Sequence, residues 1–257
     1  MGMADARAVV RRYFDEQRPM PEQGRLGLLR TAATLAVVGL SGFAYILWSI
    51  LNDAGAAALD EPLRDWFVEL RGPRWDGVMW FLSMVTGPVF LPVLMLVLTV
   101  GWIWFGKHAW RPTMLAGGML LGVGIAIVIR DTVDKPRPPP DLMVLFEADH
   151  TFSFISGHTL GATNFALLGF YVLYSRHTNP RPWMFWGGLA AAVLWILSSA
   201  SSRLYTGFHW FTDVVGSMCI AMAILGLAIA VDTWRTAEPV GTPAGPDTEP
   251  AGPPAAR

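Results

Sequence analysis

Six long apolar segments constrain this chain more than any other feature of its sequence. Each is close to the roughly 20 residues that a helix needs to cross a bilayer, and Pro88 and Pro92 are expected to kink the second one. Only 15% of the 257 residues are charged, whereas a soluble domain carries about 25%. The sequence therefore predicts an all-α polytopic membrane protein, a bundle of six transmembrane helices. These are residues 31–51, 77–105, 112–129, 159–175, 182–202 and 214–231.

The distribution of Lys and Arg between the connecting segments predicts the orientation of these helices. The connections after the second and fourth helices carry Lys107, Arg111, Arg176 and Arg181, whereas the connection after the first is rich in Asp and Glu. We therefore expect a multi-pass protein of the plasma membrane with both termini in the cytoplasm. Three connections then lie together on the outer face, at residues 52–76, 130–158 and 203–213.

Composition divides the chain into three parts. Residues 1–26 are polar and Arg-rich, without the apolar core and cleavage site of a signal peptide, so we expect a cytoplasmic N-terminal segment. Residues 27–235 form the predicted six-helix membrane domain. Residues 236–257 are rich in Pro, Gly and Ala and are expected to be a disordered tail.

The first outer connection contains apolar residues at helical spacing between residues 57 and 71. This pattern predicts a short amphipathic helix that lies at the membrane interface. Two roles are open for this helix. It forms a lid or wall beside a lipid site, or it packs at the interface without any part in function.

Three ionisable residues of the last outer connection lie at the membrane boundary, where such groups mark a functional site by default. They are Arg203, His209 and Asp213. The four-residue spacing of His209 and Asp213 places them on one face of a helix. A carboxylate at that position can hold one imidazole nitrogen and leave the other free as a base or a nucleophile.

The connection before the fourth helix carries more cations than the orientation requires. Arg130, Lys135 and Arg137 lie on the face where positive charge is disfavoured, which indicates an anionic ligand. The planar guanidinium of Arg matches phosphate oxygens two at a time. Arg130 has a second interpretation, because a side chain at the end of a helix can simply extend to the interface.

A helix start follows these cations. Ser156 is a preferred N-cap, and Gly157 lets a ligand approach the unpaired N–H groups of the first turn. His158 lies in that turn, on the membrane face that also carries His209. The combination of two histidines, several cations and a helix N-terminus suits a phosphoryl group, which one imidazole attacks while the other protonates the leaving oxygen.

Other ligand classes are less well supported. Asp131, Asp134 and Asp141 are scattered among cations and prolines, so we expect chemistry without a metal or any other cofactor. A net charge of −1 and the lack of a basic tract exclude nucleic acid as a partner. The expected partners are the bilayer and a lipid phosphate within it, and the oligomeric state is left open.

These residues form three blocks that resemble the signature of the type 2 phosphatidic acid phosphatase superfamily. The first block of the family is Lys, six residues and Arg-Pro, and here Arg130 stands for the Lys and Arg137-Pro138 end the block. The second is Pro-Ser-Gly-His, which here reads Ile155-Ser156-Gly157-His158. The third is Ser-Arg, five residues and His, matched by Ser202-Arg203 and His209. The resemblance covers roughly residues 76–232.

The resemblance implies a role for each matched residue. His209 is implied to be the nucleophile that forms a phosphohistidine, with Asp213 orienting it and His158 as the general acid. The implied phosphate-binding residues are Arg130, Arg137, Ser156, Gly157 and Arg203. Neither departure from the signature, at Arg130 or at Ile155, removes a group that makes or breaks bonds, and Lys135 is an extra cation that could partly replace the missing Lys.

The predicted function is therefore that of a metal-independent membrane lipid phosphatase with its site at the extracytoplasmic helix ends. An outward-facing site suits a polyprenyl (undecaprenyl) diphosphate, which ranks first, with phosphatidylglycerophosphate and phosphatidic acid as alternatives. Two functions of another class stay open. The cations could serve an anion or lipid transporter, or the chain could be a catalytically inactive lipid-binding relative.

Overall fold

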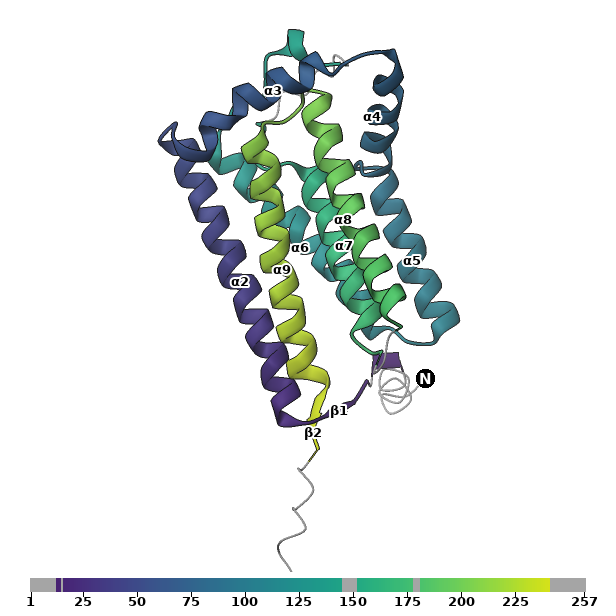
Figure 1. The fold of residues 1–257 in the computed structure, drawn as a ribbon. Coiled ribbons are helices and arrows are strands. Elements are labelled where there is room, and N and C mark those ends of the chain that lie inside the picture. The colour runs from purple at the N-terminus through teal and green to yellow at the C-terminus, as the bar shows by residue number, and fades with distance from the viewer. Residues whose placement is uncertain (1–12, 15, 145–151, 178–180, 241–257) are drawn as a thin grey trace, which may run out of the picture.

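The protein is almost entirely helical over residues 13–14, 16–144, 152–177 and 181–240, which the computed structural model describes. The long helices lie side by side as a bundle, and α3 lies across one end of it (Figure 1). In chain order the elements are β1 (Arg18–Met20), α2 (Glu22–Leu51), the 3-10 helix η1 (Gly55–Leu59), α3 (Asp60–Glu69), α4 (Pro73–Val85), α5 (Phe90–Gly106), α6 (Trp110–Val133), the 3-10 helix η2 (Pro140–Leu142), α7 (Gly157–Tyr174), α8 (Pro182–Tyr205), α9 (Phe211–Thr236) and β2 (Ala237–Pro239).

The predicted class, an all-α polytopic membrane protein, is confirmed, but the predicted count of six spans is not. Among the described residues, α2, α6, α8 and α9 are each long and apolar enough to cross a membrane. The second predicted span is two helices, α4 and α5, bent by 45° at a short break, and this pair adds a fifth crossing if it is one span. Pro88 lies in the break and Pro92 in the first turn of α5, as expected for a kink.

Helix α7 does not reach the same hydropathy because it lies inside the bundle, packed against α6, α8 and α9. Its buried face includes Thr159, Thr163 and Asn164 beside apolar residues such as Leu168. A helix surrounded by other helices does not need a uniformly apolar surface, since little of it faces lipid. These polar side chains lower the mean hydropathy of α7, the quantity by which a membrane span is recognised in a sequence.

Small residues let α2 and α9 pack closely. A Cβ atom added at Gly39 would lie 2.6 Å from the carbonyl oxygen of Cys219, and one added at Gly226 would lie 2.6 Å from that of Ala32. Lipid chains are as apolar as Leu side chains, so helices in a membrane associate mainly through such close packing. This contact fixes α9, whose first turn carries part of the site described below.

We expect Gly39→Ala to destabilise the protein by about 1–3 kcal/mol, because the added methyl group overlaps the backbone of α9. Thermal unfolding in detergent measures the change. Gly27→Ala, in the same helix, is the matched control, since a Cβ atom there meets nothing within 4 Å. A more stable Gly39→Ala variant would contradict the close packing.

The predicted interfacial helix corresponds to η1 and α3. Phe67 of α3 packs against Ala200 and Leu204 of α8 and Val214 of α9, whereas Trp66 is 51% exposed. No residue of α3 lines the cavity described below. This contact supports packing over the helix ends and not a wall of the cavity.

The two ends of the described chain meet at the end of the bundle opposite α3 (Figure 1). Strands β1 and β2 pair in parallel there, with Arg18 opposite Ala237. Helix α2 begins at Glu22 and β2 occupies residues 237–239, so both elements extend into the segments assigned to the cytoplasmic N-terminal part and to the tail. Residues 1–12, nearly half of the N-terminal part, and residues 241–257, most of the tail, lie outside the described residues.

Candidate active site

A cavity of about 470 Å³ lies between the α4–α5 break, α6 and the start of α7. Its volume is in the range of small-molecule sites. One end is cationic and the other is apolar, with Leu91, Met119 and Val123 in its wall. Six predicted site residues line the cationic end, namely Arg130, Arg137, Gly157, His158, Arg203 and His209.

His209 and Asp213 form a buried pair at the start of α9. Nδ1 of His209 lies 3.2 Å from Oδ2 of Asp213, and the same oxygen accepts a hydrogen bond from the backbone N–H of Trp210 at 2.9 Å. The carboxylate therefore holds the ring by Nδ1 and leaves Nε2 without a carboxylate contact. The two side chains are 4% and 0% exposed, respectively, so this geometry is held away from water.

The pKa of His209 is low in this environment. Burial is the main cause that lowers it, the hydrogen bond to Asp213 raises it and the charge on Arg203 lowers it; together these effects bring the pKa to about 4. The imidazole is therefore neutral near pH 7, the form in which its free nitrogen is a nucleophile.

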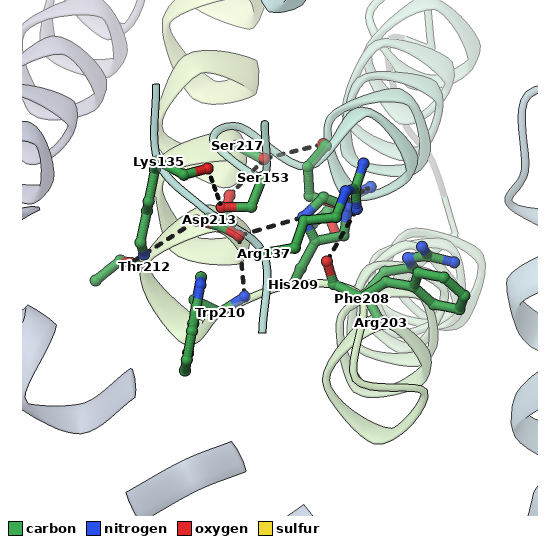
Figure 2. A network of polar contacts seen from close by, with 12 residues as sticks. Lys135, Arg137, Ser153, Arg203, Phe208, His209, Trp210, Thr212, Asp213 and Ser217 are labelled. Atoms are coloured by element: carbon green, nitrogen blue, oxygen red, sulfur yellow. Dashed lines mark hydrogen bonds and ion pairs between the residues drawn. The ribbon is translucent and has the colours of Figure 1, made fainter. Parts of the chain in front are cut away.

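Lys135 lies behind this pair and does not line the cavity. Its Nζ lies 3.2 Å from Oδ1 of Asp213 and 2.8 Å from Oδ2 of Asp60, and it also donates to the hydroxyl of Thr212. Figure 2 shows Lys135 and Thr212 on one side of Asp213, with His209 and Arg137 on the other. This placement does not fit the predicted role of Lys135 in binding phosphate, because Asp213 separates its ammonium group from His209.

Three arginines surround the cationic end of the cavity. Arg137 donates to the carbonyl oxygen of Phe208 at 2.9 Å, and Arg203 donates to the hydroxyl of Ser83 at 2.6 Å while its guanidinium lies over the ring of Phe208. Arg130 reaches the start of α7, and its buried Nε has no hydrogen-bond partner among the residues that the structure describes. A buried cationic N–H without a partner is costly, and an anion in the cavity would supply one.

The start of α7 has the geometry expected for an anion site. The Ser156 hydroxyl accepts a hydrogen bond from the Thr159 N–H at 3.3 Å, which caps the helix. Ser217 of α9 donates to the carbonyl oxygen of Ser156 at 3.0 Å, so the N-termini of α7 and α9 are held together. His158 faces the α4–α5 break, where a Cβ atom on Gly87 would lie 3.3 Å from its Nε2.

Sequence reasoning missed Asp60, Ser83 and Asn164. Asp60 supports Asp213 through Lys135, Ser83 contacts Arg203, and Asn164 lines the apolar end of the cavity. Each lies outside the three motif blocks. A signal existed only for Asn164, as a polar residue within an apolar run.

The described part of the chain contains no group of three or more His, Cys, Asp or Glu side chains arranged to hold a metal ion. Asp213, which contacts His209, and Asp60 both have Lys135 as a partner. An anion at the cationic end of the cavity would meet the arginines and the N–H groups at the start of α7.

Comparison with known proteins places this site in a family. The sequence model of the PAP2 superfamily matches residues 111–237, from α6 to the start of β2. Phosphatidylglycerophosphatase B of Escherichia coli (strain K12) is 25% identical over 245 residues, covering 74% of this chain and 90% of that protein. Phosphatidylglycerophosphatase B of Bacillus subtilis (strain 168) is 25% identical over 201 residues, covering 76% and 94%.

A solved structure shares the fold. The crystal structure of a transmembrane PAP2-type phosphatidylglycerolphosphate phosphatase from Bacillus subtilis superimposes with a TM-score of 0.66 and 20% identity, covering 77% of this chain and 98% of that one. The family match contains every predicted site residue, from Arg130 to Asp213. With its membrane-spanning helices, the chain is thus a membrane protein with a PAP2-superfamily domain at residues 111–237.

Proposed function

We propose that this protein is an integral membrane lipid phosphatase, which removes a terminal phosphate from a lipid phosphate or diphosphate through a phosphohistidine. One observation carries the proposal: His158 and His209, from separate helix starts, line the same cavity together with three arginines. The phosphatases among the relatives support the same chemistry. A transporter would need charged groups along a path through the bundle, whereas these cluster at one end of a single cavity.

The geometry supports a two-step reaction. Nε2 of His209 attacks phosphorus, and the phosphorus–oxygen bond to the lipid breaks as the leaving oxygen takes a proton from His158. Burial and the nearby arginines lower the pKa of His158, and the negative charge of the bound phosphate raises it again, which supplies the protonated form. Asp213 stabilises the positive charge on the phosphorylated imidazole. A water molecule then gives a proton to His158 and attacks phosphorus, which releases phosphate and restores His209. Arg130, Arg137 and Arg203 stabilise the charge on the equatorial oxygens in both steps.

The apolar end of the cavity supports a lipid substrate. Val123 and Ile127 of α6 line the cavity and are 57% and 54% exposed, so this wall also faces the surroundings of the bundle. A lipid chain can thus reach the cavity from the membrane while its phosphate lies against the arginines. A small water-soluble phosphate ester would leave this apolar wall uncovered.

One polar group in that wall bears on the choice of lipid. Asn164 is 1% exposed; its Nδ2 donates to the carbonyl oxygen of Gly118 at 3.5 Å, and its Oδ1 has no partner among the described residues. A lipid hydroxyl that reaches Asn164 would supply the donor that this oxygen lacks, and a polyprenyl chain carries no such group. We therefore rank phosphatidylglycerophosphate first and undecaprenyl diphosphate, the first choice from sequence, second.

The bundle supports an outward-facing site in the plasma membrane. The cavity is lined by the C-terminal ends of α6 and α8 and the start of α7. In Figure 1, α3 lies across one end of the bundle, and β1 and β2 lie at the other. This arrangement agrees with the distribution of Lys and Arg, which predicts both termini in the cytoplasm. Undecaprenyl diphosphate stays the second candidate because an outward-facing site suits it.

Phosphate release by the purified protein in detergent tests the function. The panel comprises phosphatidylglycerophosphate, phosphatidic acid and undecaprenyl diphosphate, each with and without EDTA. We expect release from phosphatidylglycerophosphate to be fastest and unchanged by the chelator. Loss of activity with EDTA would contradict metal-independent chemistry, and uptake of lipid into liposomes without any phosphate release would favour a transporter.

Asn164→Leu tests the ranking of the lipids. The variant keeps the size of the side chain but loses the acceptor, so we expect kcat/KM for phosphatidylglycerophosphate to fall about tenfold, the value of one hydrogen bond. The same variant should leave undecaprenyl diphosphate unchanged. An equal loss on both lipids would mean that Asn164 only supports the fold.

A further inference from the structure

Asp60 lies outside every motif of the site, and yet its carboxylate is the second partner of Lys135. We propose that Asp60 is a positioning residue of the active site, which acts through Lys135 and Thr212 to fix Asp213 and to set the net negative charge behind His209. The proposal rests on the phosphatase function proposed above. It assigns to α3 a part in the chemistry, although no residue of that helix lines the cavity.

Asp60 is buried and hydrogen-bonded to both Thr212 and Lys135. The side chain is 7% exposed as a residue, and its Oδ1 accepts a hydrogen bond from the backbone N–H of Thr212 at 2.9 Å. Its Oδ2 accepts from the Thr212 hydroxyl and from Nζ of Lys135, both at 2.8 Å. Thr212 immediately precedes Asp213 in the first turn of α9. One carboxylate therefore holds both the backbone next to Asp213 and the cation that contacts it.

The charges in this cluster alternate. Asp213 and Asp60 are carboxylates, and the ammonium group of Lys135 lies between them, at 3.2 Å and 2.8 Å. The three groups together carry one negative charge. Without Asp60, the charge of Lys135 would cancel that of Asp213, and the imidazole would lose the anion that stabilises its positive charge during attack. Without Lys135, two poorly solvated carboxylates would together favour a protonated His209.

Other charged groups around His209 belong to the opposite side of the ring and are unchanged by substitutions in this cluster. They are Arg130 of α6, Arg137 in the α6–α7 connection, His158 of α7 and Arg203 of α8. Arg64 of α3 lies over the ring of Trp210 and pairs with Asp65. A change in the protonation of His209 after substitution of Asp60 or Lys135 thus reports on the Asp60–Lys135–Asp213 cluster.

Two single variants are expected to act in opposite directions. Asp60→Asn keeps an acceptor for the Thr212 N–H but removes a negative charge, so the pKa of His209 should fall below its already low value of about 4. Lys135→Met removes the cation, so this pKa should rise by about one unit. The double variant has the original net charge, and the pKa should return close to that of the unchanged protein.

The titration is followed by NMR on the full-length protein in detergent, with 13C-labelled histidine and His209→Ala to assign the signal. This readout needs no substrate, so it is independent of the phosphatase proposal, which fails if the unchanged protein releases no phosphate from any lipid. Where activity is present, Asp60→Asn should also lower kcat about 10- to 100-fold, with little change in KM. Losses of this size are typical when a residue that orients the partner of a catalytic group is removed. Asp60→Glu, which retains the charge, should recover part of the loss.

Asp65→Asn is the matched control, because Asp65 lies in the same helix with a side chain that is 60% exposed. It should change neither the titration nor kcat. If both single variants moved the pKa of His209 in the same direction, or left it unchanged, Asp60 would only anchor α3 and the proposal would be wrong. If Asp60→Asn does not accumulate as folded protein, the double variant is compared with Lys135→Met. The pKa of His209 should be lower in the double variant, whereas a purely structural role of Asp60 predicts the same pKa in both.

Discussion

Replacing His209 with alanine is expected to reduce phosphate release from every lipid by at least about ten-thousandfold, because the variant has no group that can attack phosphorus. The neighbouring arginines and the start of α7 would still bind phosphate, so KM should change far less than kcat. Radiolabelled lipid phosphate gives a second measurement. Acid quenching destroys a phosphohistidine whereas alkaline quenching preserves it, and label on the unchanged protein should be absent from the variant.

Two further histidine substitutions separate the role of His209 from that of the general acid and from a nonspecific effect of losing a histidine. His158→Ala should lower kcat about 100- to 10,000-fold, the usual contribution of a general acid, and should still allow labelling of His209 when the leaving group is good. His177→Ala is the matched control, since His177 is exposed beyond the end of α7, far along the helix from the cavity. Full activity of His209→Ala would overturn the mechanism.

Asp232→Ala is expected to destabilise the protein by about 3–5 kcal/mol, because it removes one partner of a buried ion pair and the acceptor shared by several buried donors. Asp232 is 0% exposed and accepts hydrogen bonds from Trp110 Nε1 at 2.8 Å, the Tyr171 hydroxyl at 2.6 Å and both terminal nitrogens of Arg176 at 2.8 and 2.9 Å. These contacts tie α6, α7 and α9 together at the end opposite the cavity. Denaturation in mixed micelles measures the free energy of unfolding.

The comparison with other variants separates charge from packing. Adding Arg176→Ala to Asp232→Ala should recover only a small part of the lost stability, because in the single variant Arg176 still pairs with Glu16 at 2.9 Å. Glu22→Ala removes an exposed partner of Arg25 and should have no measurable effect. The folded fraction of Asp232→Ala should keep its kcat. If Asp232→Ala were as stable as Glu22→Ala, the hydrogen bonds and the ion pair of Asp232 would contribute little to the free energy of unfolding.

The helices and the motif residues were predictable because their signals are local. A long apolar segment has few alternatives to a membrane helix, and the prolines at 88 and 92 indicate the kink that the structure places between α4 and α5. The motif spacing likewise brings His158 and His209 to helix starts on one face. Helix α7 shows the limit of this reasoning, because its polar residues are stabilised by neighbouring helices that hydropathy does not consider.

The placement of Lys135 and Asp60 was not predictable for a different reason. The sequence states that a cation lies two residues before Arg137, but only packing decides that its side chain turns to the far side of Asp213. Asp60 is one of several acidic residues in its connection, and nothing in the sequence distinguishes the buried one. Both depend on contacts between residues more than 70 positions apart.

The family match begins at residue 111, whereas Thr86, Gly87 and Leu91 of the cavity wall precede it. The bond-making groups and one boundary of the space for the lipid are thus encoded in separate halves of the polypeptide. Exchanging the first half would change this wall and leave His158 and His209 in place, but it would also replace Asp60, the partner of Lys135. Chimeras that are joined in the α5–α6 connection and keep an aspartate at position 60 would test whether this wall sets the substrate preference.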